Sequence, residues 1–349
     1  MVWYGSHNYY CVEVTALLQL EQVGEFGLIR LLATDTINDP ATVVVGIGDD
    51  AAVFLPAARQ LQLLTTDMLV ENIHFDLKTT TPWQLGYKAI AVNLSDIAAM
   101  GGVPRQAAVS LALPRNTQVE FVANLYQGMK EICREFGVNI VGGDTVSSPQ
   151  GLVINVVLTG EVEPANLVKR SGAQAGDVVI VTGNLGNSAA GLDILNTECW
   201  EEFDFARPLV TSHLTPRPQV KLGQLLAAAG ASSMNDISDG LGSESHEIAK
   251  ASGVGMVLYA DRIPLSQEAI QAAAKFSKIP LNYALYGGED YQLLVTMPPD
   301  KFERLRHQEQ LRLILIGEVT EAKDEVILIY PDGTTEKIEP RGYNHFRTD

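Results

Sequence analysis

The sequence predicts an α/β (α+β) fold of two domains, with mixed sheets and flanking helices. The chain has 349 residues, a length that suits two hydrophobic cores rather than one. Short runs rich in β-branched residues are interspersed with helical patterns, but strands and helices do not alternate strictly. We therefore expect sheets in which parallel and antiparallel strands are combined. No repeat of fixed period is present in the sequence.

The predicted domain boundary lies at a crossing segment, 164–176, which gives domains of 25–163 and 164–349. Residues 1–24 are treated as an N-terminal extension and are assigned no function. The start of this extension has no basic residues and no clean apolar stretch, so it is not typical of a signal peptide.

Strand and helix patterns in the first domain follow one another closely. A short helix is expected at 28–32, and a helix at 83–100 is almost wholly small and apolar, which is typical of a buried helix. Two glycines and then a proline follow that helix, as expected at a helix end. The remaining patterns predict strands at 43–47, 61–65, 106–113, 139–141 and 152–162, and a helix at 119–136.

The second domain is expected to begin with a strand at 177–182, followed by a glycine-rich loop at 183–191. That loop joins a strand to a helix, so it could hold a phosphate, although ordinary turn chemistry explains it equally well. Further patterns predict helices from 188, at 220–229, 242–251 and 266–275, strands at 254–259 and 291–296, and a helix–strand–strand ending at 330.

Composition narrows the class of partner. The net charge is −17, which argues against nucleic acid or an anionic membrane as the main partner. Three cysteines are scattered without metal-ligand or redox spacing, which favours a reducing compartment. No apolar run reaches membrane-spanning length, and we expect the protein to be cytoplasmic.

Acidic residues recur beside glycines where the predicted strands and helices end. Aspartates are costly to bury unpaired, so a single pocket built from such motifs needs cations. Hard cations such as Mg²⁺ prefer oxygen ligands and usually accompany phosphate groups. The motifs are GIGDDAAV (46–53), TTDMLVENIHF (65–75), NLSDIAAMG (93–101), GGDT (142–145), NDISDG (235–240) and GGEDY (287–291).

Each carboxylate also has a purely structural explanation, and these explanations differ in strength. Asp96 is expected in the last turns of an apolar helix, where the helix dipole disfavours a negative charge, so a structural role explains it poorly. An N-cap role would account for one of Asp236 and Asp239 but not readily for both. Glu289 could simply cap a turn, and His74 could be an ordinary surface histidine.

Several common catalytic patterns are absent from the sequence. It contains no Walker A motif, no protein-kinase motif set and no dinucleotide-binding glycine fingerprint. No Ser-His-Asp or Cys-His set emerges either, so covalent catalysis is not suggested.

Taken together, the motifs resemble those of the thiamine-monophosphate kinases. These belong to an ATP-binding superfamily that includes aminoimidazole ribonucleotide synthetase and selenophosphate synthetase. The resemblance runs from about residue 25 to residue 346, and the motifs occur in the expected order: GIGDDAA, TTDMLVENIHF, KAIAVNLSDIAAMG, GGDT, KRSGAQAGD, DISDGL, GGEDY and RGYNHF.

The resemblance implies a fold like that of aminoimidazole ribonucleotide synthetase and a homodimer in which the N-terminal domains, which bind ATP and Mg²⁺, pair their sheets. It implies transfer of the ATP γ-phosphate to thiamine monophosphate, giving thiamine diphosphate, with several Mg²⁺ ions. The acceptor phosphate is already anionic at neutral pH, so no catalytic acid, base or covalent nucleophile is expected.

By resemblance, the site residues fall into three groups. The Mg²⁺ ligands are Asp50, Thr65, Thr66, Asp67, Asp96, Asp144, Asp236 and Asp239. The ATP contacts are Tyr126, Gly143, Asp144, Arg170 and Ser238. The contacts to the thiamine substrate are His74, Glu289 and Tyr343.

Two alternatives remain open at this point. The first is another enzyme of the same superfamily, but a selenophosphate synthetase is expected to carry a reactive cysteine beside a glycine-rich segment, and Cys11 has no such setting. The second is a non-catalytic nucleotide- or metal-binding module that has kept the scaffold. The complete acidic set argues against such a module, because a degenerate relative should lose ligands first.

Overall fold

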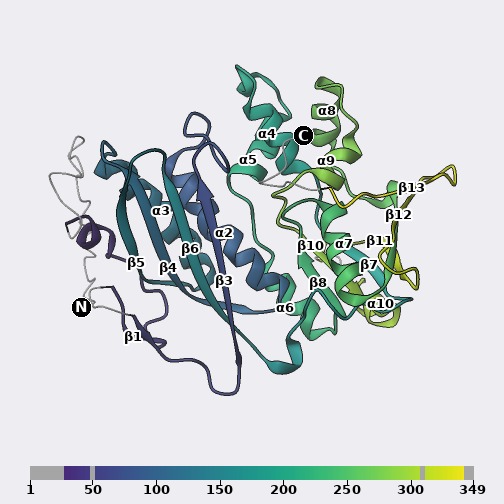
Figure 1. The fold of residues 1–349 in the computed structure, drawn as a ribbon, viewed down its shortest axis with the longest axis horizontal. Helices are drawn as coiled ribbons and strands as arrows, with labels where there is room; N and C mark the ends of the chain where they lie inside the picture. The colour runs from purple at the N-terminus through teal and green to yellow at the C-terminus, as the bar shows by residue number, and fades with distance from the viewer. Residues whose placement is uncertain (1–26, 48–51, 307–310, 342–349) are drawn as a thin grey trace, which may run out of the picture.

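Two sheets with helices packed against them form the protein (Figure 1). The structure is a computed structural model that describes residues 27–47, 52–306 and 311–341. Residues 27–32 are helical, as expected. The first half then contains β1 (Val43–Val45), β2 (Val53–Phe54), β3 (Leu61–Val70), α2 (Pro82–Ala99), β4 (Val103–Pro114), α3 (Val119–Phe136), β5 (Asn139–Ser148) and β6 (Val153–Val162).

The second half continues with shorter elements. Its helices are α4 (Asn187–Leu195), α5 (Ala206–Leu214), α6 (Val220–Ala228), α7 (Leu241–Ser252), α8 (Gln267–Lys275), α9 (Pro280–Tyr286) and α10 (Pro299–Arg306). Its strands are β7 (Val178–Thr182), β8 (Ser233–Asp236), β9 (Gly255–Tyr259), β10 (Leu293–Met297), β11 (Leu313–Thr320), β12 (Val326–Ile329) and β13 (Thr335–Lys337). Three short 3₁₀ turns are η1 (Pro164–Asn166), η2 (Trp200–Glu202) and η3 (Ala260–Arg262).

The predicted mixed sheets are confirmed. The first sheet has the strand order β3-β6-β4-β5, with β4 and β5 parallel and the other neighbours antiparallel. The second sheet has the order β13-β12-β9-β11-β7-β10-β8, and β12 and β9 form its parallel pair. Strands β1 and β2 form a separate antiparallel pair.

Helix α2 is the central element between the two sheets. It begins with a capping box between Thr81 and Gln84, and Pro82 occupies its first turn, where a missing N–H costs nothing. It packs against α3 in its own half and against α6 and β8 in the second half. A Cβ at Gly223 of α6 would lie 2.2 Å from the carbonyl oxygen of Ala98, so only glycine permits this close contact between the halves.

The hydrophobic core is continuous across the predicted boundary at 163/164. Buried side chains of α2, such as Leu94 and Ile97, belong to the same cluster as Met234 of β8 and Val295 of β10. A second cluster lies on the other side of the seven-stranded sheet and a third among α4, α5 and α8. None of the described helices is long and apolar enough to cross a membrane.

One face of the first sheet is covered and the other is exposed. Figure 1 shows its four strands in front of α2 and α3, which cover the inner face. The outer face presents apolar side chains to solvent: Leu64 is 73% exposed, Met68 54% and Val146 51%. An exposed apolar sheet face of this kind is typical of an interaction surface.

Two strands of this sheet continue five or more residues beyond their predicted C-terminal ends. β3 was expected to end at residue 65 and β5 at residue 141, but they extend to Val70 and Ser148. Ladder pairing causes the difference: β3 pairs with β6 along its whole length and β5 pairs with β4 up to Pro114, so polar and glycine residues that resemble a turn are held extended. Thr65–Asp67 and Gly143–Asp144 therefore lie within strands, not at their ends. Helices α5 and α9 and strands β2, β8 and β13 were not predicted, and the start of the NDISDG motif, which was expected to be a loop, lies in β8.

Candidate active site

Three carboxylates from separate elements meet where the two halves join. Asp67 lies on β3, Asp96 in the last turn of α2, and Asp236 at the end of β8. The hydroxyl of Thr65 donates a hydrogen bond to Asp96 Oδ2. Ser95 Oγ donates a 2.7 Å hydrogen bond to Asp236 Oδ2. The prediction that Asp96 lies near the C-terminus of an apolar helix is confirmed.

The charges of these carboxylates are poorly compensated. Burial, followed by the charge of Asp96, raises the pKa of Asp67 to about 7. Burial, followed by the same charge, also raises the pKa of Asp236 to about 7. Among the described residues, Asp67 Oδ2 is a buried oxygen with no hydrogen-bond partner. A buried, mutually repelling carboxylate cluster is stabilised by cations.

These oxygen donors fit a Mg²⁺ ion that also binds a ligand. They fit less well a Mg²⁺ ion that is bound by protein side chains alone. Within the described ranges, no three Asp, Glu, His or Cys side chains are grouped tightly enough to hold a metal by themselves. Mg²⁺ is usually bound by one or two carboxylates together with water and substrate phosphates. Hydroxyl and carboxylate oxygens from Thr65, Asp67, Asp96 and Asp236 suit that mode.

An open cavity of about 480 Å³ lies beside the acidic cluster. Thr65, Asp96 and Asp236 line it, and so do the cationic residues Lys169 and Arg170. Apolar residues from both halves also line it, among them Leu63, Ile97, Met100 and Met234. The cavity thus offers an apolar surface, cationic groups and carboxylates together, a combination that suits a nucleotide and its metal-bound phosphates.

A buried glutamate supports the residues of the NDISDG motif. Glu244, in the first turn of α7, accepts hydrogen bonds from the side chain of Asn235, from Ser238 Oγ at 3.4 Å and from the Asp239 N–H at 3.3 Å. Asn235 Oδ1 in turn accepts a 3.0 Å hydrogen bond from Arg170 Nε. Burial, then the charges of Asp236 and Asp239, raises the pKa of Glu244 to about 8. Glu244 was not among the predicted site residues.

Consecutive residues of the GGEDY motif make different contacts with the rest of the protein. Glu289 and Tyr291 adopt positive φ angles of 67° and 49°, conformations that are strained for residues other than glycine. Their N–H groups donate to the carbonyl oxygens of Ser238 at 2.7 Å and Ile237 at 2.9 Å. These bonds hold the segment against the loop that follows β8.

The carboxylate of Asp290 binds the backbone of the glycine-rich loop 183–191, the loop that was considered as a phosphate site. This carboxylate accepts hydrogen bonds from the Gly186 N–H at 2.5 Å and the Ser188 N–H at 3.2 Å, at the start of α4. The N-terminus of this helix is therefore capped by a carboxylate of the protein itself. The turn interpretation of residues 183–191 is the one that the structure favours.

Glu289 contacts two residues that were not predicted. Lys88 Nζ of α2 lies 2.8 Å from Glu289 Oε2, and His213 Nδ1 of α5 lies 3.2 Å from the same oxygen. Burial favours the neutral acid, but the charge of Lys88 and the neighbouring imidazoles outweigh it, so the pKa of Glu289 is lowered. Burial, reinforced by Lys88, lowers the pKa of His213 to about 3, so this imidazole is neutral near pH 7.

His74 lies four residues beyond the end of β3. Its Nδ1 accepts a 3.0 Å hydrogen bond from the Val70 N–H, and it is close enough to contribute to the lowered pKa of Glu289. The structure therefore places His74 near Glu289, and their role in substrate binding stays a prediction.

Thr66 and Asp144 lie on the outer face of the first sheet, opposite the acidic cluster. Side chains alternate between the two faces of a strand, so Thr66 points away from Thr65 and Asp67. Thr66 Oγ donates a 3.1 Å hydrogen bond to Asn155 on β6. Asn155 is paired with Ser110 and Ser110 with Asp144, so these side chains share the outer face. Thr66 and Asp144 remain predicted Mg²⁺ ligands, but they lie on the opposite face of the sheet from Asp96.

The remaining predicted residues have different settings. Gly143 has a packing reason to be glycine, because a Cβ there would lie 1.8 Å from the carbonyl oxygen of Val109. Tyr126 of α3 is 7% exposed within the main hydrophobic cluster, and burial raises its pKa to about 12. Asp50 and Tyr343 lie outside the described residues.

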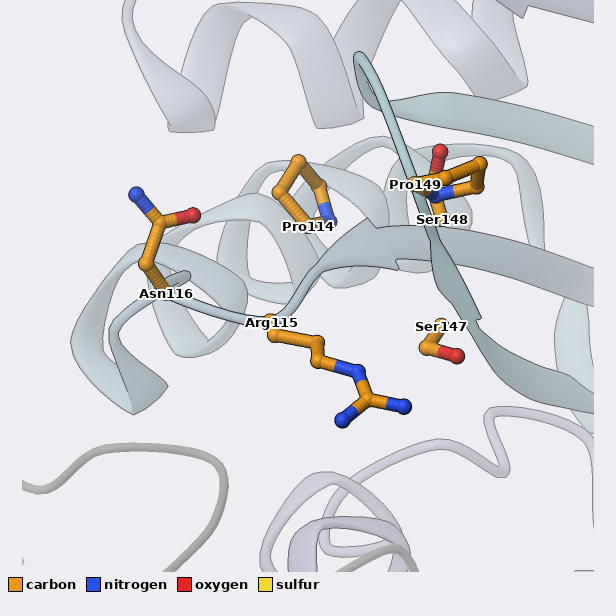
Figure 2. A pocket seen from close by; sticks show the side chains of 6 residues that line it. All are labelled: Pro114, Arg115, Asn116, Ser147, Ser148 and Pro149. Atoms are coloured by element: carbon orange, nitrogen blue, oxygen red, sulfur yellow. The ribbon is translucent and has the colours of Figure 1, made fainter.

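A second cavity lies at the far ends of β4 and β5 (Figure 2). It measures about 430 Å³ and contains none of the predicted site residues. Its lining is formed by Pro114, Arg115, Asn116, Ser147, Ser148 and Pro149.

Comparisons with known proteins agree with this architecture. Residues 48–162 match the family model of the AIR synthase related protein N-terminal domain, and residues 174–329 match that of the C-terminal domain. The thiamine-monophosphate kinase of Bacillus subtilis is 36% identical, over 93% of this chain and 99% of its own length. That of Aquifex aeolicus is 39% identical, over 94% of this chain and 100% of its own length.

A solved structure extends the match to three dimensions. AaThiL complexed with AMPPCP and TMP has a TM-score of 0.76 and 37% sequence identity, and the match covers 95% of this chain and 100% of that chain. The fold, the order of the motifs and the identity over nearly the whole length lead to one conclusion. The chain belongs to the thiamine-monophosphate kinase family, within the AIR synthase related proteins.

Proposed function

We propose that this protein is a thiamine-monophosphate kinase, which transfers the γ-phosphate of ATP directly to thiamine monophosphate and releases thiamine diphosphate and ADP. The observation that carries the proposal is the meeting of Asp67, Asp96 and Asp236 beside a cavity that also presents Arg170. Family membership and the likeness to a kinase complexed with AMPPCP and TMP support the choice of both substrates.

The reaction needs positioning and charge stabilisation rather than a base. The attacking oxygen belongs to the substrate phosphate and is already anionic, so no side chain has to remove a proton. Mg²⁺ ions, when bound, would supply the positive charge that lets two phosphates approach each other. Thr65, Asp67, Asp96, Asp236 and Asp239 are the residues that would hold these ions, together with Asp50 by family resemblance.

ATP is proposed to occupy the cavity beside the acidic cluster. Arg170 would contact its phosphates, since Asn235, which is itself hydrogen-bonded to Glu244, accepts a hydrogen bond from the guanidinium at the cavity. Ser238 is proposed as a further contact, because it follows the strand that carries Asp236. Tyr126, Gly143 and Asp144 remain proposed contacts by family resemblance.

Thiamine monophosphate is proposed to bind at Glu289, His74 and Tyr343. The thiamine body is cationic, and Glu289 keeps its negative charge because its pKa is lowered by Lys88 in spite of burial. The two groups attract each other across a site of low dielectric. His74 lies near this carboxylate, and Tyr343 is assigned by resemblance alone.

A homodimer formed by the outer faces of the first sheets is part of the proposal. Leu64, Met68 and Val146 expose apolar surface on that face, and pairing would bury it. Thr66 and Asp144 lie on the same face, so they would act from the dimer interface. The N-terminal domain, 25–163, would bind ATP and Mg²⁺ and form the dimer, and domain 164–349 would complete the nucleotide and substrate site. We place the protein in the cytoplasm.

A direct assay tests the function. Purified protein is incubated with ATP, Mg²⁺ and thiamine monophosphate, and thiamine diphosphate and ADP are measured. We expect equal amounts of the two products, loss of activity with EDTA and recovery with added Mg²⁺. Absence of thiamine diphosphate above a control without enzyme would contradict the proposal and would favour a non-catalytic binding protein.

A further inference from the structure

We propose that Lys88 and His213 are positioning residues for recognition of thiamine monophosphate: they fix one carboxylate oxygen of Glu289 so that the other faces the substrate. This inference rests on the proposed function. Neither residue is assigned a role by the family resemblance described above.

Lys88 is an unusual residue for its position. It lies in the apolar helix α2, is 2% exposed, and its Nζ contacts Glu289 Oε2 at 2.8 Å. Lysines are almost never fully buried unless they are paired. Glu289 comes 201 residues later in the chain and its side chain is 26% exposed. The ion pair therefore runs from the core outward, with the buried ammonium behind the carboxylate and the carboxylate accessible in front.

His213 approaches the same oxygen from a different helix. Its Nδ1 lies 3.2 Å from Glu289 Oε2 and 3.0 Å from Ser188 Oγ of α4, and the residue is 6% exposed. The hydrogen bond at Nδ1 is the one with Ser188 Oγ, and it holds the imidazole in place. His213 thus confines Glu289 Oε2 by its close approach from a buried, fixed position.

The backbone of Glu289 is also held in place. Its positive φ is maintained by the hydrogen bond from its N–H to the Ser238 carbonyl oxygen, at 2.7 Å. The next residue, Asp290, caps α4, the helix that also contributes Ser188. With backbone and Oε2 both fixed, Oε1 is left to accept a hydrogen bond from the substrate or to face its positive charge. Pre-organisation of this kind improves binding without any new contact.

A purely structural ion pair between the halves is the competing explanation, and kinetics separate the two. A structural role predicts that loss of Lys88 lowers stability and affects both substrates alike. A positioning role predicts that KM for thiamine monophosphate rises while KM for ATP does not. The expected rise is about tenfold or more, the effect of losing one well-oriented charge-assisted interaction.

The experiment compares Lys88→Met, Lys88→Arg and His213→Asn with the wild-type protein. We expect Lys88→Met to raise KM for thiamine monophosphate by about tenfold or more, His213→Asn to raise it less, and Lys88→Arg to recover part of the loss. KM for ATP should stay within about twofold in each variant. Equal increases for both substrates would overturn the proposal. Arg105→Met is the matched control, because Arg105 forms a comparable ion pair with Glu161 at 2.9 Å in the first sheet, and both KM values should stay unchanged.

A double variant guards against misfolding and tests the route of the effect. Glu289→Gln removes the charge that Lys88 neutralises, so Lys88→Met in that background leaves no unpaired buried charge. If Lys88 acts through Glu289, the double variant should have the same KM for thiamine monophosphate as Glu289→Gln alone. A further increase of tenfold would contradict the proposal. Inactivity of the wild-type protein would instead contradict the proposed function, so the two failures are distinguishable.

Discussion

Ser95 Oγ on α2 donates a 2.7 Å hydrogen bond to Asp236 Oδ2 at the end of β8, and so joins the two halves of the chain at the acidic cluster. The next residue, Asp96, presents its carboxylate to Thr65 of β3. One turn of α2 therefore connects a strand of the first sheet with a strand of the second. The acidic site exists only when both halves are packed together.

Substitution of Asp96 tests whether its carboxylate has a catalytic or a structural role. We expect Asp96→Asn to lower turnover by about a thousandfold or more, because a Mg²⁺ ligand and its charge are lost. Thermal stability should be unchanged or higher, since burial raises the pKa of Asp96 and its charge also raises the pKa of Asp67. The measurement is turnover together with the unfolding temperature.

The matched control is Asp300→Asn, at an exposed aspartate that pairs with Arg304 on α10. It should change neither quantity. Near wild-type turnover of Asp96→Asn would contradict the proposed Mg²⁺-binding role and would indicate a structural role for Asp96.

The two neighbouring threonines of β3 should differ because they face opposite sides of the sheet. Thr65→Val removes the hydroxyl that donates to Asp96 and should lower turnover by about tenfold more than Thr66→Val, whose hydroxyl contacts Asn155 on the outer face. Steady-state rates at saturating substrates measure the difference. A larger loss for Thr66→Val would place the reacting phosphates on the outer face.

The difference between Thr65 and Thr66 also shows which features could be predicted from the sequence and which could not. Helix α2 was predicted to within one residue at each end, because its apolar pattern and its flanking glycines and proline are local features. The ends of β3 and β5 were not, because pairing with β6 and β4 holds polar and glycine residues extended. Without the true end of β3, its alternation could not separate Thr66 from Thr65 and Asp67.

The network around Glu289 was missed for a related reason. Lys88 is a single cation within an apolar helix, and such a residue requires a buried partner. That observation could have identified Lys88 as notable. The sequence could not identify Glu289 as the partner, because that contact depends on the packing of α2 against a segment of the second half. His213 lies on α5, a helix that was not predicted at all.

A pair of adjacent glycines tests the packing role of Gly143. A Cβ at Gly143 would lie 1.8 Å from the Val109 carbonyl oxygen, whereas a Cβ at Gly142 would have no atom within 4 Å. We expect Gly143→Ala to lower the free energy of unfolding by about 2–4 kcal/mol and Gly142→Ala by less than about 1 kcal/mol. Chemical denaturation measures both. Equal stability of the two variants would leave ATP binding as the only reason for glycine at position 143.

His213 gives a pH dependence with a defined sign. Burial, then the charge of Lys88, lowers its pKa to about 3 in the folded protein, against about 6.5 in the unfolded chain. The unfolded chain therefore binds the proton first, and this residue lowers the stability of the folded state as pH falls from about 6.5 toward 3.

Replacement of this histidine removes the effect. Relative to the wild type, the free energy of unfolding of His213→Asn should rise by about 2 kcal/mol between pH 7.5 and pH 5. Urea denaturation at both pH values measures it, and groups that titrate in both proteins cancel in the comparison. An identical pH dependence in the two proteins would show that His213 is protonated freely in the folded state.

The most direct test of the account is a crystal structure of the protein with a non-hydrolysable ATP analogue, Mg²⁺ and thiamine monophosphate. We predict metal ions bound by Asp96 and Asp236 beside the nucleotide phosphates, Arg170 at those phosphates, and Glu289 in contact with the thiamine body. Phosphates and metal ions bound elsewhere, with Asp67, Asp96 and Asp236 in contact with neither, would contradict the account.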